Sequence, residues 1–185
     1  MTNDSTPAVP LDDPTEARLA AATTLWGERE VATRAVALVG GYNAGDEFLL
    51  YVGGRHAQGI LAGAPVLYWP ELWGTRALLY VWDSSATEAV GAALANQAWR
   101  VREMATRVVA ARDLDFAAVL VGLLTDEVAR VRAASARALG AVGSATNLDD
   151  IRPLLKDPEI DVRRAAQQGI AEIRGRHSEG AEPEA

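Results

Sequence analysis

The chain has 185 residues, of which 49% are hydrophobic and 23% are charged, and this balance is typical of a soluble globular protein of one domain. Its longest apolar runs are too short to cross a bilayer, and its polar first residues carry no secretory signal. Because the chain also lacks cysteine, which excludes disulfides, we expect a cytoplasmic protein.

The net charge of −7 comes from the two ends of the chain. Seven carboxylates near the ends have no basic neighbours, and residues 17–176 then hold 18 carboxylates and 18 basic residues. A neutral body of this kind does not favour nucleic acid as a partner through its overall charge. We expect residues 1–14, which include three prolines, to form a disordered arm, and residues 175–185 to form an acidic tail.

Residues 15–82 are expected to form an irregular, aromatic-rich helical half. One helix is predicted over residues 15–39, where two glycines follow it, and a short helix over residues 46–52. Residues 53–67 are rich in glycine and are expected to be irregular, with one or two helical turns possible over residues 57–62. A helix is predicted over residues 70–82, because proline suits its first position. It should be largely buried, because few of its residues are polar.

Most of the aromatic residues lie in this N-terminal half. Irregular helices need bulky side chains to fill uneven gaps, so a role in the core is the favoured interpretation. The alternative is an aromatic-lined pocket or an anchor patch for a partner. Eight of the eleven aromatic residues lie between positions 42 and 82, namely Tyr42, Phe48, Tyr51, Tyr68, Trp69, Trp73, Tyr80 and Trp82.

The C-terminal half contains one helical-hairpin pattern three times. Val101, Val131 and Val162 occupy the same position of the pattern, 30 and 31 residues apart. A fixed period of this length is typical of a stacked array, in which no unit can bury its apolar face alone. The repeats are predicted at residues 83–112, 113–143 and 144–174. Their second helices carry a column of apolar and small residues, Val101/Ala105/Val109, Val131/Ser135/Leu139 and Val162/Ala166/Ile170.

The run from Leu123 to Gly140 resembles a HEAT repeat of the short type, about thirty residues long. Two leucines end its first helix, an aspartate lies in the turn, and Val-Arg opens the second helix, which closes with Ala-Leu-Gly. Residues 154–158 and Val162-Arg163 repeat this pattern. The resemblance, over residues 83–174, implies an all-α fold, an α-solenoid of stacked antiparallel helical hairpins in a HEAT-like superhelix. It also implies a scaffold that presents a surface to a partner.

Each repeat carries an arginine directly after the valine and a polar residue in the preceding turn. Matched acidic and basic columns at one period favour an internal ladder, in which each arginine bonds the turn of its own or the adjacent repeat. The alternative is a row of guanidinium groups that follows a phosphate backbone. The ladder positions are Asn96, Arg102, Asp126, Arg132, Asp157 and Arg163.

A second set of arginines has no counterpart in the third repeat, where Asp161 and Gln168 stand, and is expected on the surface. With exposed tryptophans it would bind a protein partner, because tryptophan and arginine dominate binding interfaces. We therefore expect a non-enzymatic scaffold without a cofactor. The candidate partner-binding residues are Trp69, Trp73, Trp99, Arg100, Arg107, Arg130 and Arg137.

Two other functions stay open at this point. Trp82-Asp83, near Trp73, Arg76 and Trp99, resembles the aromatic and acidic residues of HEAT-like DNA glycosylases of alkylation repair, although Asp83 is also typical of a turn before a helix. The first alternative is therefore a nucleic-acid-binding protein or a DNA glycosylase of this type. Short HEAT-like repeats also occur in bilin-attaching proteins, so the second alternative is a small-molecule or chromophore-binding protein.

The sequence offers little for metal or phosphate-loop chemistry. Its two histidines, His56 and His177, belong to no His/Cys cluster with the spacing of metal ligands, so no metal site is predicted. The loop from Gly53 to His56 could bind an anion through its backbone, but it lacks the phosphate-loop lysine and glycine spacing. A loop between helices is the favoured interpretation.

Overall fold

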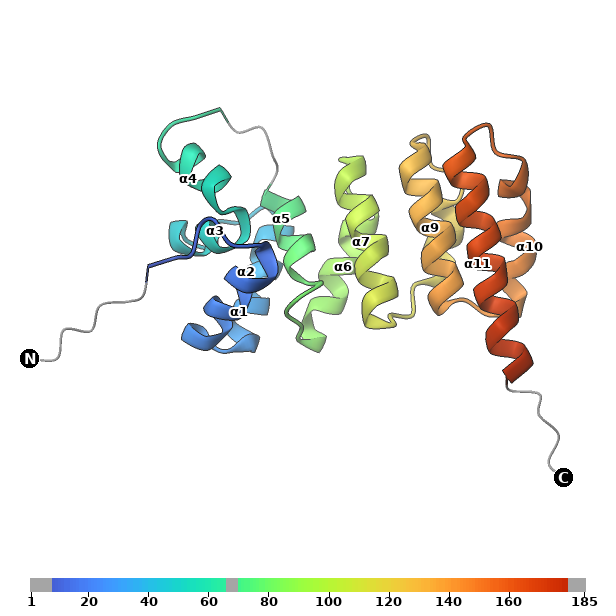
Figure 1. Cartoon of the computed structure of the whole chain (residues 1–185), viewed down its shortest axis with the longest axis horizontal. Helices are drawn as coiled ribbons and strands as arrows, with labels where there is room; N and C mark the ends of the chain where they lie inside the picture. Colours follow the sequence, from blue (N-terminus) through green and yellow to red (C-terminus); the bar gives the residue numbers. More distant parts are fainter. Residues whose placement is uncertain (1–7, 66–69, 180–185) are drawn as a thin grey trace, which may run out of the picture. The chain divides into compact units, whose positions relative to one another are not determined.

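The computed structural model describes residues 8–65 and 70–179, with side chains up to residue 176. All regular structure in these ranges is helical and no strand occurs within them, in agreement with the expected α-solenoid. The chain divides into two compact units, Met1–Ala89 and Val90–Ala185, and their boundary lies within helix α6 (Thr87–Leu94) (Figure 1).

The N-terminal unit differs from the prediction in three places. Residues 53–67, expected to be irregular, contain a helix over Arg55–Leu61, which begins two residues before the helical turns considered possible there. The single helix predicted over residues 15–39 is wrong, because Gly27 interrupts it with a φ of +83°, a conformation that glycine adopts without steric cost. The helix predicted over residues 70–82 ends at Ala77 and passes into a turn. The helices are α1 (Thr15–Trp26), α2 (Glu28–Val39), α3 (Asp46–Gly53), α4 (Arg55–Leu61) and α5 (Pro70–Ala77).

The aromatics of this unit divide between core and surface. Phe48 and Tyr51 of α3 are 0% and 1% exposed, and the Trp26 ring packs 6.3 Å and 5.2 Å from their ring centroids. Tyr42 and Tyr80 are 72% and 42% exposed. The core interpretation therefore holds for the α3 aromatics and fails for these two tyrosines.

Residues 8–14 form no helix or strand, but two of them contact arginines of the N-terminal unit. Within residues 8–14, Asp12 accepts a hydrogen bond from Arg55 Nε at 2.6 Å, and the Asp13 carbonyl accepts one from Arg18. Composition alone does not reveal these two contacts, and the disordered arm over residues 1–14 stays a prediction. Residues 1–7 lie outside the described residues.

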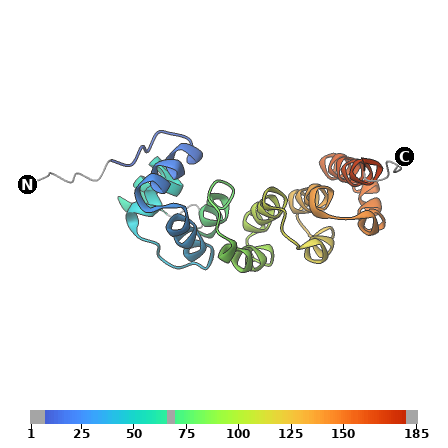
Figure 2. The same cartoon turned by 90° about the horizontal axis from the view of Figure 1, so that it is seen from below.

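The C-terminal unit is built from helical hairpins. Its helices α7, α9 and α11 lie in one row, with α8 and α10 in a second row (Figure 2), and α9 packs against α7, α8 and α11. Helix α11 continues beyond the repeat end expected at residue 174, so the acidic tail predicted from residue 175 is helical up to residue 179, and residues 180–185 lie outside the described ones. The helices are α7 (Trp99–Arg112), α8 (Ala117–Leu123), α9 (Ala129–Val142), α10 (Leu148–Ile151) and α11 (Ile160–Glu179).

The three predicted columns of apolar and small residues form the core between successive second helices. Val101, Val131 and Val162 are all 0% exposed. The middle positions, which are alanine or serine, are also 0% exposed, and the last positions are at most 9% exposed. Small side chains in the middle let α7, α9 and α11 approach closely, as a stacked array requires.

Gly169 of α11 provides a test of this close approach. A Cβ atom there would lie 2.4 Å from the Ala136 carbonyl oxygen of α9, whereas a Cβ at Gly122 of α8 would have no atom within 4 Å. Gly169→Ala should therefore lower the free energy of unfolding by about 1–3 kcal/mol through overpacking. Gly122→Ala, the matched control, should raise it by up to about 1 kcal/mol, because alanine is the better helix former. Urea denaturation measures both, and equal effects would contradict the tight α9–α11 contact.

Candidate functional site

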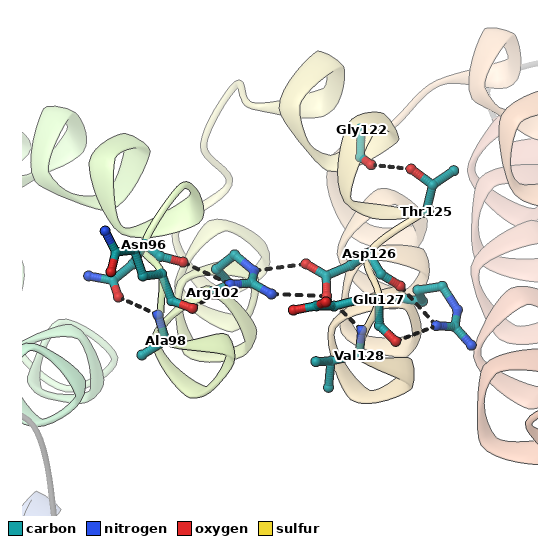
Figure 3. Close-up of polar contacts among 10 residues, drawn as sticks. Asn96, Ala98, Arg102, Gly122, Thr125, Asp126, Glu127 and Val128 are labelled. Atoms are coloured by element: carbon teal, nitrogen blue, oxygen red, sulfur yellow. Dashed lines mark hydrogen bonds and ion pairs between the residues drawn. The ribbon is translucent and has the colours of Figure 1, made fainter.

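Arg102 connects two successive repeats through a single guanidinium group. Its Nη1 donates to the carbonyls of Asn96 and Gln97, both at 2.9 Å, in the turn that precedes its own helix. Its Nε and Nη2 donate to the two carboxylate oxygens of Asp126, in the turn of the next repeat, at 2.8 Å and 3.0 Å. Figure 3 shows the arginine between the two turns.

The same geometry recurs one repeat later. Arg132 Nη1 donates to the carbonyls of Asp126 and Glu127, at 2.8 Å and 3.2 Å. Its Nε and Nη2 donate to Asp157 at 2.8 Å and 3.0 Å. In the third repeat Arg163 Nη1 donates to the carbonyl of Asp157 at 2.7 Å. The six ladder residues are thus brought together as one internal network.

Each turn residue also shapes the start of its second helix. The side-chain oxygens of Asn96, Asp126 and Asp157 accept a hydrogen bond from the backbone N–H two residues later, at 2.8 to 2.9 Å. An amide and a carboxylate can both make this turn, but only the carboxylate can form an ion pair with a guanidinium. Asn96 is the first turn residue of the ladder.

The side chains of the ladder are largely buried. Arg102 and Asp126 are 12% and 6% exposed, and Arg132 and Asp157 are 15% and 9% exposed. Bidentate pairs shielded from water in this way hold the hairpins in register, and their guanidinium groups are already saturated with acceptors. Arg102 and Arg132 are therefore not available to a ligand.

Removing one ladder arginine should destabilise the C-terminal unit. Arg132→Ala leaves the buried Asp157 carboxylate without its partner, and we expect a loss of about 3 kcal/mol in the free energy of unfolding. Arg152→Ala is the matched control, because its pair with Asp149 is exposed and should change stability by less than about 0.5 kcal/mol. Thermal and urea denaturation compare the two, and a similar small loss in both would refute the structural role of the ladder.

The ladder should also make stability depend on pH. The hydrogen bonds from Arg132 hold the pKa of the Asp157 carboxyl below its ordinary value. A carboxylate with a lowered folded-state pKa stabilises the fold above its unfolded pKa, and that contribution disappears as the pH falls through the folded value. The stability gap between the wild type and Asp157→Asn should therefore shrink as the pH falls below about 4. A gap that stays constant across this range would argue against the pairing, with Asp149→Asn as the exposed control.

The second arginine set lies on the exposed face of α7 and α9. The guanidinium carbons of Arg100 and Arg130 lie 4.4 Å and 5.3 Å from the centre of the half-buried Trp99 ring, in cation–π geometry. Arg130 also donates to Glu103 at 3.2 Å. Arg107 and Arg137 are exposed, and neither has an ion-pair partner in the part of the chain that the structure describes.

Two adjoining hollows open on this face. The larger, of about 510 Å³, lies between α9 and the residues around the start of α11, and the smaller, of about 270 Å³, lies between α7 and α9. Glu103 and Arg137 line both of them, so we treat the two as one feature, the α7–α9 hollow. Its floor is made of buried small residues, Ala133, Ala134 and Ala138.

The charges around the α7–α9 hollow are mixed. Arg107, Arg130 and Arg137 line it, and so do Glu103, Glu159 and Asp161. The sequence predicts the arginines, but the three carboxylates were not expected at the same place. Only Asp161 had a signal in the sequence, because it stands at the position that Arg100 and Arg130 occupy in the first two repeats.

The remaining candidate residues are not on this surface. Trp73 lies in the N-terminal unit and is 5% exposed, so its side chain is core rather than contact surface. Trp69 lies outside the described residues. Asp83, considered as part of a glycosylase-like site, accepts hydrogen bonds from the backbone and side chain of Ser85 and so begins the next helical turn.

The repeats can now be assigned. Residues 87–171 match the family model for HEAT repeats. These residues belong to the HEAT-repeat family. The match covers the ladder and the α7–α9 hollow, so both are features of HEAT repeats rather than of an unrelated helical fold. No curated protein sequence matches the chain.

Two further findings concern other classes of site. No group of three or more His, Cys, Asp or Glu residues in the described ranges is placed to hold a metal ion. Within the same ranges, no helix has the length and apolar character needed to span a membrane.

Proposed function

We propose that this protein is a cytoplasmic, non-enzymatic HEAT-repeat scaffold that binds a protein partner in the α7–α9 hollow. The observation that carries the proposal is a pair of exposed arginines, Arg107 and Arg137, which lie beside an alanine floor and have no ion-pair partner among the described residues. Unpaired guanidinium groups next to a shallow apolar surface suit a segment that offers carboxylates and a small apolar side chain.

The charge pattern favours a protein over a nucleic acid. A nucleic-acid groove neutralises successive phosphates, and carboxylates within it would repel them. The hollow contains Glu103, Glu159 and Asp161 beside its arginines. A polypeptide can present both signs of charge, with acidic residues near Arg107 and Arg137 and a basic residue near Asp161.

Trp99 supports the same surface from its edge. Arg100 and Arg130 lie over its ring, which keeps both planar groups in place and lowers the entropy lost on binding. A tryptophan flanked by arginines is also the composition that dominates measured binding energies at protein interfaces.

A peptide selection tests this proposal directly. A random displayed library is selected on the wild-type chain, and the recovered peptides should be enriched in Asp and Glu. Their affinity for the double variant Arg107→Glu/Arg137→Glu should fall by about a hundredfold, because two attractive charge contacts become repulsive. The control Arg152→Glu reverses an exposed charge outside the hollow and should bind normally.

The circular dichroism melting curve of the double variant should stay cooperative, since both side chains are exposed. Equal binding by both variants, or selected peptides with no acidic enrichment, would refute the proposed surface. Tight binding of duplex DNA that weakens steeply with salt would instead support the nucleic-acid alternative.

A further inference from the structure

The N-terminal unit contains a cavity of about 350 Å³ that the proposed scaffold function does not use. Two arginines, Arg18 and Arg76, line it together with Thr15, His56 and Trp73, and we call it the arginine cavity. His56 is exposed, so solvent reaches at least one wall. The cavity lies within a single unit and is separate from the α7–α9 hollow.

Arg18 is the more deeply buried of the two arginines, with 7% of its surface exposed. Its Nε donates to the Tyr51 carbonyl at 2.8 Å, and its Nη2 donates to Thr15 Oγ1 at 3.1 Å and to the Val52 carbonyl at 3.3 Å. Gly54 permits this position, since a Cβ there would lie 2.9 Å from Arg18 Nη1.

Arg76 approaches the same backbone from α5. Its Nη2 donates to the Val52 carbonyl at 3.1 Å, the acceptor that Arg18 also uses. Its Nε is buried and has no hydrogen-bond partner among the residues that the structure describes. A buried donor without an acceptor costs free energy, and a bound ligand could supply the missing acceptor.

Among the described residues, the positive charge in the arginine cavity is only partly offset, by the nearby Asp13 carboxylate. Neither arginine forms an ion pair with a carboxylate in the described ranges; Asp13 is near Arg18 but contacts it through its backbone carbonyl. The C-terminal end of α3 offers a partial negative charge of about one half, against two full positive charges. Burial lowers the pKa of both guanidinium groups, and the charge of Arg76 lowers the pKa of Arg18 further.

Aromatic and aliphatic side chains form part of the cavity wall beside the arginines. Trp73 is 5% exposed, and the His56 ring meets its ring edge-on, with centroids 5.9 Å apart and an interplanar angle of 90°. Leu72 contributes an aliphatic surface beside them. A volume of this size accommodates a small organic molecule, and several polar groups converge on it beside an aromatic surface.

We propose that the arginine cavity binds a small organic anion, whose carboxylate or phosphate group contacts Arg18 and Arg76 and whose apolar part packs on Trp73. The oxyanion accepts hydrogen bonds from both guanidinium groups, including the buried Nε of Arg76, and neutralises their charge. Because this site is independent of the α7–α9 hollow, its test and the peptide selection can succeed or fail separately.

Isothermal titration calorimetry on the full chain tests the proposal with three probes at constant ionic strength: inorganic phosphate, phenyl phosphate and benzoate. Phenyl phosphate should bind more tightly than inorganic phosphate, because its ring displaces water beside Trp73. The ranking of phenyl phosphate against benzoate identifies which head group the cavity prefers. Arg76→Gln should weaken binding of the preferred probe by about tenfold or more. Arg29→Gln, which removes an exposed charge from α2 of the same unit, should not.

Thermal denaturation separates binding from a purely structural role. If Arg76 binds the anion, phosphate should raise the melting temperature of the wild type and of Arg29→Gln but not that of Arg76→Gln. If Arg76 only caps the end of α3, the variant will melt lower by the same amount with and without phosphate, and the proposal is overturned. Absence of binding heat for all three probes would overturn it as well.

Discussion

The C-terminal unit depends on the mutual cover of helices that cannot bury their own apolar side. Val101, Val131 and Val162 are inaccessible to water, although a single hairpin would leave each of them half exposed. The close approach of α9 and α11 at Gly169 shows how little space separates neighbouring hairpins. Because apolar cover is non-directional, it would permit adjacent hairpins to slide, and a directional interaction has to select one register.

The arginine–aspartate ladder provides that direction. Arg102 and Arg132 each span two repeats, and their bidentate geometry tolerates only one offset between hairpins. Arg107 and Arg137 lie further along the same two helices and are exposed, and neither forms an ion pair with a described carboxylate. One residue type therefore has two roles in each helix, one structural and one available for recognition, and burial distinguishes them.

The two units differ in how charge is handled. In the HEAT repeats, Arg102 and Arg132 each form an ion pair with an aspartate in the turn of the following repeat. In the N-terminal unit Arg18 and Arg76 meet only carbonyls and a hydroxyl among the described residues. Two positive charges held close together in this way disfavour each other, and the anion proposed for the arginine cavity would offset them.

The sequence alone determined what repeats at a fixed spacing. The period of 30 and 31 residues, the buried columns and the matched Arg and Asp positions follow from it, because each is a local pattern that recurs. It also predicted that Arg107 and Arg137 differ from the ladder arginines, since the third repeat lacks them. The burial of Trp73 and the meeting of Arg18 with Arg76 were decided only by tertiary structure. These features depend on contacts between residues 20 to 60 positions apart, for which a chain without repeats carries no periodic signal.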